Sequence, residues 1–243
     1  MDPLSEYFKP ELVHKAQEAN PFLKLNDVVY NIIENGIIYG MLPPGTRLGV
    51  VRIAGLLEVS RTPVSEALEQ LSNEGLVVTP SNRKGHYVFD ISHTSLEQLF
   101  MARKSLEGTA AYICARQKAL IDMDRMRSLA VQFRRAFDER KFDNFAEVDQ
   151  EFHSHIVISS RNPYLVKMYK AMNRFISYYS IRSQEYLLSL QNEPTFAVLA
   201  GVQMAIYRAI ELGIPELAET TLKNHLNTCY NLCMRYHTTV GTL

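Results

Sequence analysis

The hydrophobic pattern of the chain changes twice along its length, and these changes limit the folds that it can adopt. From Leu25 apolar residues recur at the spacing of a helix. Over 76–79 and 86–89 the sequence has two short runs rich in β-forming residues, separated by the turn-rich segment Pro-Ser-Asn-Arg-Lys-Gly. Helical spacing returns after Ile91 and continues almost to the end of the chain. The pattern predicts a mainly α fold in two parts, of which the first carries a small β-hairpin.

The first part has the order of elements of a winged helix-turn-helix. Three helices are expected, with the hairpin after them, over 25–40, 50–57 and 62–73. Thr62 is suited to cap the third helix and Pro63 to occupy its first position. In such a module the helix after the turn enters the major groove of DNA, so this helix is the first place to look for contacts with bases.

The remaining sequence has the pattern of an all-α helical bundle. Helices are expected over 94–114, 122–138, 143–159, 164–190, 195–212 and 215–236. A capping box at Thr94-Ser95-Leu96-Glu97 opens the first of them. Short connections between successive helices are typical of a bundle. The chain is therefore divided into a polar N-terminal arm, a winged helix-turn-helix domain and a helical domain, over 1–20, 21–92 and 93–243.

Composition excludes some classes of protein and leaves the partner open. The longest run without a charged residue, Pro194–Tyr207, is shorter than the roughly 20 residues that a membrane-spanning helix needs. Three cysteines and no apolar leader at the N-terminus favour a reducing, cytoplasmic location. Because 26 basic residues balance 26 acidic ones, net charge does not predict binding to nucleic acid. Any case for such binding rests on where the cations lie.

Polar residues near the start of the third helix are candidates for contact with DNA. The apolar stripe of that helix must face the core, which leaves Arg61, Thr62 and Ser65 outward, where they can reach bases or phosphates. The hairpin turn adds a second set of candidates, Arg83, Lys84, Gly85 and His86. Residues 25–90 hold five basic and seven acidic residues, so strong nonspecific binding is not expected, and ordinary solvated charges are the alternative interpretation.

Two short segments of this domain have a highly specific sequence. They are Leu42-Pro43-Pro44-Gly45-Thr46-Arg47-Leu48 and Val59-Ser60-Arg61-Thr62-Pro63-Val64, followed by Ala67-Leu68, Leu71 and Glu74-Gly75-Leu76-Val77. Together they resemble the winged-helix signature of the GntR family of bacterial transcription regulators. The resemblance implies that Arg61, Thr62 and Gly85 contact operator DNA, with Arg47 as a further candidate. The family usually has arginine where this chain has Ser65, which puts one phosphate or base contact in doubt.

Asp149 and His153 form a candidate metal site in the helical domain. Their i, i+4 spacing puts both on one helix face, where an aspartate and a histidine can chelate one divalent ion. His225, on the last helix, can complete the site if the bundle brings the two helices together. A helix salt bridge or a buried, hydrogen-bonded histidine is the alternative interpretation. His155 faces elsewhere on the same helix and is not expected to share the site.

Three further stretches extend the resemblance to the helical domain. They are Arg103-Lys104-Ser105-Leu106-Glu107, Asp149-Gln150-Glu151-Phe152-His153 with Asn162, and Ala205-Ile206-Tyr207-Arg208-Ala209-Ile210 with Ala218 and His225. Over about 95–236 the chain resembles the ligand-binding (FCD-like) domain of the FadR-type subgroup, many members of which bind a divalent metal through one aspartate and three histidines. The resemblance implies Asp149, His153 and His225 as ligands, and the remaining histidine position falls on Gln203. Either zinc or nickel is held by three residues with water or an effector carboxylate, or Gln203 hydrogen-bonds an effector in a metal-free pocket.

Other residues of the helical domain have two interpretations each. Arg103 can bind an effector carboxylate or form a salt bridge with Glu107. Cys229 and Cys233 follow His225 at intervals of four, which allows a zinc site, although core packing is favoured. Core packing is also favoured over a pocket lining for Tyr178, Tyr179, Ser180 and Tyr186.

These features predict an effector-responsive transcription regulator of the cytoplasm rather than an enzyme. A homodimer is expected to bind a palindromic operator on double-stranded DNA, to act as a repressor and to sense a small organic acid in the helical domain. A helical domain that only dimerises is one alternative. A metal-dependent enzyme, in which Asp149, His153 and His225 activate water, is disfavoured. The sequence has no His-Glu-x-x-His motif, glycine-rich phosphate loop or Gly-x-Ser-x-Gly motif.

Overall fold

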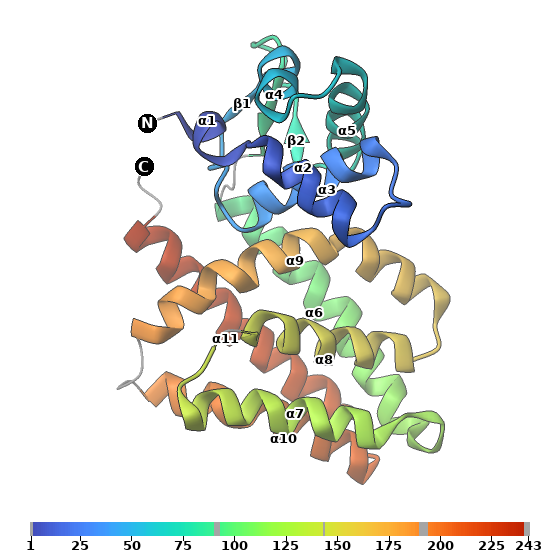
Figure 1. Cartoon of the computed structure of the whole chain (residues 1–243). Helices are drawn as coiled ribbons and strands as arrows, with labels where there is room; N and C mark the ends of the chain where they lie inside the picture. Colours follow the sequence, from blue (N-terminus) through green and yellow to red (C-terminus); the bar gives the residue numbers. More distant parts are fainter. Residues whose placement is uncertain (1, 90–92, 143, 190–193, 241–243) are drawn as a thin grey trace. The chain divides into compact units, whose positions relative to one another are not determined.

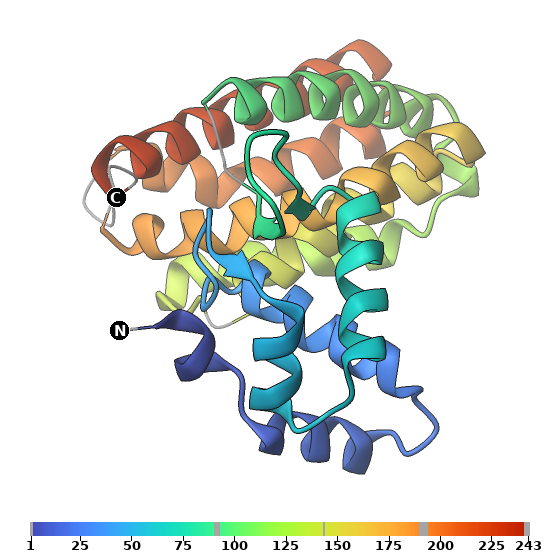
Figure 2. The same cartoon turned by 90° about the horizontal axis from the view of Figure 1, so that it is seen from above.

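The chain divides into two units, Met1–Ile91 and Ser92–Leu243, which are shown in two views in Figures 1 and 2. The computed structural model describes the backbone of residues 2–89, 93–142, 144–189 and 194–240. Within these ranges it describes all side chains except those of 93–94, 120, 182–189, 194–195 and 236–240.

The N-terminal unit contains the predicted winged helix-turn-helix. The motif comprises α3 (Leu25–Ile38), β1 (Arg47–Leu48), α4 (Val50–Leu57), α5 (Arg61–Asn73), β2 (Val77–Val78) and β3 (His86–Val88). The strands form an antiparallel sheet in the order β1-β3-β2, in which Arg47 pairs with Tyr87 and Val77 with Val88. The hairpin is confirmed, whereas β1 was not expected, because a strand of two residues is too short to show an alternating pattern.

Apolar stripes on α3 and α5 form the core of this unit. Ile33, Ile37, Val64 and Leu68 have no exposed surface, and the two helices pack along each other. The turn from α4 into α5 is tight because Glu58 adopts a left-handed conformation (φ 55°) that ends α4. The helix pair of the motif is therefore fixed both by burial and by the geometry of its turn.

The start of α5 differs slightly from the prediction. The residue at the N-cap is Ser60, whose side chain makes no capping hydrogen bond, and Thr62 is the second residue of the helix. Pro63 is the third residue, where a backbone N–H has no partner within a helix in any case. The local sequence thus tolerates proline at this position, and Thr62 is left free of a capping role.

The first twenty residues form two helices, where the sequence predicts a polar arm. They span Pro3–Tyr7 (α1) and Pro10–Ala19 (α2). Their buried apolar side chains are Leu4, Phe8 and Val13. The hydroxyl of Tyr7 donates a hydrogen bond to the carbonyl oxygen of Ile32 at 2.8 Å. Gly36 of α3 makes room for the Tyr7 ring, because a Cβ added there would lie 2.4 Å from Tyr7 Cε1. The segment is therefore part of the N-terminal unit's core.

The C-terminal unit is the predicted bundle of helices. In chain order they are α6 (His93–Arg116), α7 (Met123–Glu139), α8 (Phe145–Ser159), α9 (Pro163–Ser189), α10 (Pro194–Leu212) and α11 (Pro215–Val240), with a 3-10 turn, η1 (Lys118–Leu120), after α6. α6 and α11 lie side by side in both views, α10 packs against α7 and α11, and α8 packs against α7 and α9 (Figures 1 and 2). The ends of the helices differ from the predicted ones by only a few residues. The Thr94 side chain and Asp143, for which a cap and a helix start were predicted, lie outside the described residues.

Phenylalanine rings fill the core where α7, the start of α8 and α10 meet. They are Phe133, Phe137, Phe142, Phe145 and Phe196, with neighbouring ring centroids 4.8–6.0 Å apart. Contacts at these distances stabilise the packing beyond the burial of apolar area alone. Among the helices of the described ranges, none has the length and apolar composition needed to cross a membrane.

The packing of α1 predicts a large loss of stability when Phe8 is truncated. Phe8 has no exposed surface, whereas Phe22, in the loop after α2, is 95% exposed. We expect Phe8→Ala to lower the free energy of unfolding by about 3–5 kcal/mol, because it leaves a cavity in the core. Phe22→Ala should change it by no more than about 0.5 kcal/mol. Urea unfolding followed by circular dichroism measures both, and equal effects would show that α1 contributes nothing to the core.

Candidate DNA interface and buried polar site

The start of α5 presents a polar surface. Arg61, Thr62 and Ser65 are exposed, whereas Val64 and Leu68 are buried, as the helical period requires. The three polar side chains therefore lie on the face that turns away from the core, at the end of the helix that this motif directs toward base edges. Their contact with DNA stays a prediction.

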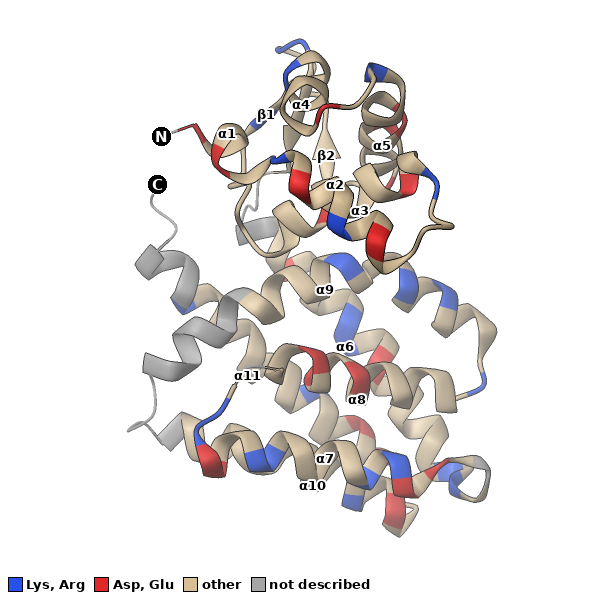
Figure 3. Cartoon of the chain, viewed as in Figure 1, with Lys and Arg blue, Asp and Glu red and all other residues tan. Residues whose placement is uncertain are grey.

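The turn between β2 and β3 supplies a second group of cations. Arg83 and Lys84 are exposed, and Gly85 has φ 111°, a conformation that L side chains rarely adopt. Arg47 of β1 lies beside this glycine, since a Cβ added to Gly85 would be 3.5 Å from Arg47 Nε. His86 is half-buried, and its Nδ1 is buried without a hydrogen-bond partner among the described residues. Figure 3 shows basic residues at this turn and at the beginning of α5, at one end of the unit.

Six polar side chains meet in the interior of the C-terminal unit. They come from α6, α8, α10 and α11, and none is more than 9% exposed: Arg103, Glu107, Asp149, His153, Gln203 and His225. We call this group the buried polar site. Burying so many polar groups is unfavourable unless each finds a partner, so their contacts indicate what the site is built to hold.

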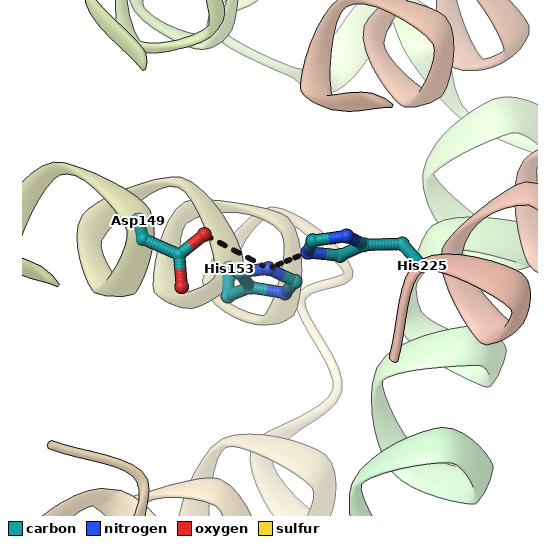
Figure 4. A group of neighbouring side chains, drawn as sticks. All are labelled: Asp149, His153 and His225. Carbon is teal, nitrogen blue, oxygen red and sulfur yellow. Dashed lines mark hydrogen bonds and ion pairs between the residues drawn. The ribbon is translucent and has the colours of Figure 1, made fainter. Parts of the chain in front are cut away.

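A chain of short contacts connects three helices at this site. Nε of Arg103 donates a hydrogen bond to Oε1 of Glu107 at 2.6 Å, and Oε2 of Glu107 lies 2.6 Å from Nδ1 of His153. Nε2 of His153 faces Nε2 of His225 at 3.1 Å, and the two rings stack with their centroids 5.1 Å apart (Figure 4). An ion pair on α6 is therefore linked through a histidine of α8 to a histidine of α11.

These contacts assign the proton positions of His153. An ionised carboxylate only accepts hydrogen bonds, so Nδ1 of His153 carries the proton that it donates to Glu107. A neutral ring then has its lone pair on Nε2, which faces Nε2 of His225. Two lone pairs repel each other at this distance, so a proton or a cation must lie between the two nitrogens. Either one of the two rings donates a proton from its Nε2, or both nitrogens ligate one cation.

Asp149 and Gln203 complete the buried polar site. Oδ1 of Asp149 lies 3.6 Å from Nε2 of His153 and accepts a hydrogen bond from Nε2 of Gln203 at 2.8 Å. In the described part of the bundle, Oε1 of Gln203 and the hydroxyl of Tyr169 are buried without a hydrogen-bond partner. Burial, and then the charge of Glu107, raise the pKa of Tyr169. An unsatisfied buried group costs about 1–3 kcal/mol, so the site favours a further polar ligand.

The charges of the site are only partly balanced. Burial alone raises the pKa of Glu107, but the guanidinium of Arg103 and the contact with His153 outweigh it and lower the pKa to about 2. Burial, reinforced by the neighbouring His153 and Arg103, lowers the pKa of His225 well below its usual range, so this ring is neutral. Arg103 offsets the charge of Glu107, whereas the buried carboxylate of Asp149 forms no ion pair with a lysine or arginine among the described residues and accepts a hydrogen bond from Gln203.

The three donor types suit a divalent metal ion, and the spacing of the two imidazole nitrogens fits one, whereas Oδ1 of Asp149, at 3.6 Å from Nε2 of His153, lies slightly farther away. One ligand atom from each of Asp149, His153 and His225 lies within 4.8 Å of the others. Two ligand atoms that are each about 2.0–2.1 Å from a zinc ion are roughly 2.9–3.4 Å apart at octahedral or tetrahedral angles. The two imidazole nitrogens, at 3.1 Å, match this spacing. Glu107 accepts the other N–H of His153, as a carboxylate does for many metal-bound histidines.

A small cavity adjoins the buried polar site. Its lining includes Arg103, Asp149, Tyr179, His225 and Cys229, and it has room of about 30 Å³ for the centres of water molecules. One water molecule needs about 10–15 Å³ by this measure. In this conformation the cavity therefore accommodates water or an ion rather than an organic acid.

Arg103 and the two cysteines of α11 had two interpretations each. Arg103 forms the salt bridge with Glu107 and also lines the cavity, so its role toward an effector stays a prediction. Sγ of Cys229 lies 3.6 Å from Nε2 of His225, and burial raises the pKa of this thiol well above its usual range. Cys233 is buried. Neither cysteine belongs to the group of ligand atoms formed by Asp149, His153 and His225, and buried single cysteines are common in protein cores.

The structure also locates Tyr178, Tyr179, Ser180 and His155. Tyr178 and Tyr179 are buried, and Tyr179 and Ser180 line the cavity, whereas the side chain of Tyr186 lies outside the described residues. Nε2 of His155 lies 3.0 Å from a backbone carbonyl oxygen in the loop before α7. It does not join the buried polar site.

Two features of the site and its surroundings were not found from the sequence. The i, i+4 spacing of Arg103 and Glu107 indicates a pair, but no sequence signal shows that Glu107 also binds His153. Tyr169 had no signal at all, because one tyrosine on an amphipathic helix is ordinary core composition.

Comparison with known families assigns both units. Residues 25–88 match the family of bacterial regulatory proteins called the gntR family. Residues 98–228, more than half of the chain, match the FCD domain. This chain belongs to the GntR family. The family and the relatives that match this GntR-type chain are transcription regulators, not enzymes.

Two curated relatives illustrate the similarity. The chain is 29% identical over 136 residues to the HTH-type transcriptional repressor RspR of Escherichia coli (strain K12). The matched segment covers 56% of this chain and 59% of the relative. It is 26% identical over 204 residues to the probable D-xylose utilization operon transcriptional repressor of Paenarthrobacter nicotinovorans, which covers 82% of this chain and 84% of the relative. The chain thus spans less than two thirds of the length of the first relative.

Solved structures show the same fold. A putative GntR transcriptional regulator from Rhodococcus sp. RHA1 has a TM-score of 0.66 and 21% identity, over 86% of this chain and 97% of that one. E. coli McbR/YncC has a TM-score of 0.66 and 19% identity, over 88% and 99%. At these identities the likeness concerns the fold alone.

Loss of the Arg103 guanidinium is expected to destabilise the helical unit. Arg103→Met leaves the buried carboxylate of Glu107 without its cation, and removing one partner of a buried pair lowers the free energy of unfolding by about 3–5 kcal/mol. Arg134→Met is the matched control. It breaks an i, i+4 pair with Asp138 whose side chains are 51% and 56% exposed, so a loss of at most about 0.5 kcal/mol is expected. Urea midpoints measure both changes.

The loss of stability in Arg103→Met is expected to depend on pH. The pKa of Glu107 is lowered from 4.5 to about 2 by folding, so the stability from its ionised form is complete above pH 4.5 and is lost as the pH falls toward 2. The difference between wild type and Arg103→Met should therefore shrink as the pH falls through this window. A difference that stays constant there would contradict an ionised pair.

Proposed function

We propose that this GntR-family chain is an effector-responsive repressor that binds a palindromic operator as a homodimer. The family model over 25–88 supports DNA binding, and relatives named as repressors support the mode of action. A dimer is proposed because one winged-helix module offers few base contacts, and two modules related by symmetry double them.

In the proposed complex α5 lies in the major groove. Arg61 forks onto a guanine or a phosphate, and Thr62 and Ser65 bond to phosphate or base from the same exposed face. Arg83 and Lys84 of the wing turn contact the adjacent minor groove, where cations are favoured. The cations are few but well placed, so affinity for nonspecific DNA should be modest.

The observation that carries a sensing function is the unsatisfied polarity of the buried polar site. The carboxylate of Asp149 is buried without an ion pair to lysine or arginine in the described structure, and Gln203 and Tyr169 add buried atoms without partners there. A unit that only dimerised would gain nothing from these groups, each of which lowers stability. We assign Asp149, His153 and His225 as ligands of one divalent ion, zinc or nickel. When bound, such an ion supplies a fixed positive charge that attracts the carboxylate of a small organic acid.

Other residues of the site orient its ligands. Glu107 fixes the tautomer of His153, and Arg103 balances Glu107 while lining the cavity. Because the cavity is small, an organic acid can enter only if its walls rearrange. Binding is therefore coupled to the positions of the helices, and an acid that prefers one arrangement shifts the population toward it.

The cavity size supports a second candidate function. A space of about 30 Å³ suits an ion with water, so the helical unit can act as a metal-bound dimerisation domain that senses no acid. Thermal shifts with a panel of small carboxylic acids separate the two candidates. A shift with one acid that disappears in Asp149→Ala supports sensing, whereas no shift across the panel supports the second candidate.

Metal analysis of protein purified without a histidine tag tests the site directly. We expect about one zinc or nickel ion per chain after supply of the metal, because three ligands are preassembled. Asp149→Ala should lose the ion, since it removes the anionic ligand, and Asp138→Ala, at an exposed position on α7, should keep it. A metal content that is the same in all three proteins would refute the assignment.

Operator binding tests the DNA interface. After selection of a binding sequence from a random duplex library, Arg61→Ala should weaken binding by about 1–3 kcal/mol, or roughly 5- to 150-fold, because a charged contact is lost. Lys15→Ala, exposed on α2 outside the proposed interface, should have little effect. Fluorescence anisotropy at fixed salt measures both, and equal affinities for the two variants would place the interface elsewhere.

A further inference from the structure

Gln203 departs from the ligand set expected of this domain, and its contacts indicate a different role. Its side chain, on α10, has no exposed surface. Nε2 donates a hydrogen bond to Oδ1 of Asp149 at 2.8 Å, and Oε1 is buried without a partner in the described residues. The amide nitrogen thus bonds the carboxylate assigned above as a metal ligand, and the amide oxygen is left without a partner.

Charge fixes the orientation of this amide. If the amide turned by 180°, its oxygen would face the carboxylate oxygen of Asp149 at the same 2.8 Å, with no proton between two acceptors. The nitrogen therefore stays on the side of Asp149. As long as Asp149 is ionised, Oε1 points away from that oxygen and cannot replace the nitrogen there.

The hydrogen bond acts on the anionic ligand of the site. Oδ1 of Asp149 lies between Gln203 on α10 and His153 on α8, at 2.8 Å and 3.6 Å. The bond from Gln203 holds the carboxylate with Oδ1 toward the histidine pair. Partners of this kind, one step removed from the ion, fix the geometry of ligands in metal sites.

We propose that Gln203 is a positioning residue and not a metal ligand. Through its N–H it holds Asp149, so the ion has three protein ligands. Its Oε1 accepts a hydrogen bond from the oxygen ligand that fills the next coordination position. This inference rests on the metal site of the proposed function and names its ligand chemistry. The exchangeable ligand binds through an oxygen that also donates a hydrogen bond, as water and hydroxy acids do and a simple carboxylate does not.

Two substitutions separate positioning from ligation. Because residue 203 lies in contact with Asp149, the imidazole of Gln203→His can reach the same ion, and zinc favours imidazole over an amide oxygen. Gln203→Leu keeps an apolar side chain of similar size and removes both the donor and the acceptor.

Zinc affinity of the intact, untagged protein, measured by competition with a chelator, is the first readout. Gln203→Leu should weaken binding by about 10–100-fold, and Gln203→His should tighten it by a factor of about 10 or more. Asp149→Ala should abolish binding in the same range. A Gln203→His protein that is folded and binds zinc no more tightly than wild type would overturn the inference.

Titration of the zinc-loaded protein with glycolate and acetate tests the exchangeable ligand. The two acids differ by one hydroxyl, and the bond to Oε1 should favour glycolate by about five- to tenfold in wild type. Gln203→Leu should lose this preference. Equal affinities of wild type for the two acids would overturn the part of the inference that concerns Oε1.

A crystal structure of the zinc-loaded wild type shows directly whether Gln203 positions Asp149 or ligates the ion. We expect ligand atoms of Asp149, His153 and His225 about 2.0–2.2 Å from the ion and the amide of Gln203 still bonded to Asp149. A Gln203 oxygen at bonding distance from the ion overturns this inference and leaves the proposed metal site standing. A wild type that binds zinc no better than Asp149→Ala overturns both.

Discussion

The buried ion pair between Arg103 and Glu107 is the interaction on which the helical unit depends most. Taking two charges out of water is unfavourable, and the attraction between them offsets this only when the remaining polar atoms are also bonded. Here Oε1 of Glu107 accepts a hydrogen bond from Arg103 and Oε2 accepts one from His153. Because both oxygens are used, His153 is held in one tautomer with its Nε2 toward α11. One helix, α6, thereby sets the geometry of a site whose other members lie on α8, α10 and α11.

The contacts of the buried polar site couple the positions of the helices to one another. The contact between His153 and His225 joins α8 to α11, and the bond between Gln203 and Asp149 joins α10 to α8. The interior of the bundle is closely packed. A ligand that changes the distance between His153 and His225, or between Gln203 and Asp149, must therefore move the helices that carry these residues. The same α11 packs along most of α6, which extends a change at the site over the length of the unit (Figure 2). A small ligand can in this way favour one arrangement of the bundle over another.

Spacing in the sequence predicts local pairs, and packing decides what completes them. The i, i+4 pairs Asp149–His153 and Arg103–Glu107 were both visible in the sequence, and both meet in the structure. Nothing in the spacing connects Glu107 with His153 on another helix. His225 was a candidate only if packing brought its helix to this pair, and the place of Gln203 followed from a family resemblance rather than from periodicity. The N-terminal unit shows the same limit. Its long amphipathic helices were predicted, but β1 has two residues, and α1 and α2 each bury a single apolar side chain. Such short or sparse elements carry too little pattern to be found without their neighbours.

Charge sets the order in which ligands can enter the buried polar site. With neutral imidazoles the site has one excess negative charge, on Asp149, and a carboxylate placed about 4 Å away would be repelled by about 4 kcal/mol at an effective dielectric constant of 20. With a divalent cation held by Asp149, His153 and His225, the excess becomes one positive charge, and the same carboxylate is attracted to a similar extent. The organic acid of the proposed function would therefore bind the metal-loaded form in preference and stabilise it in return, since the coupling of two binding equilibria is reciprocal. In the proposed function the response to an acid then depends on the metal. Because Gln203 is not a ligand in this proposal, the ion has three protein ligands and is held less tightly than an ion with four. The metal content of the site, and with it the response to an acid, can therefore vary.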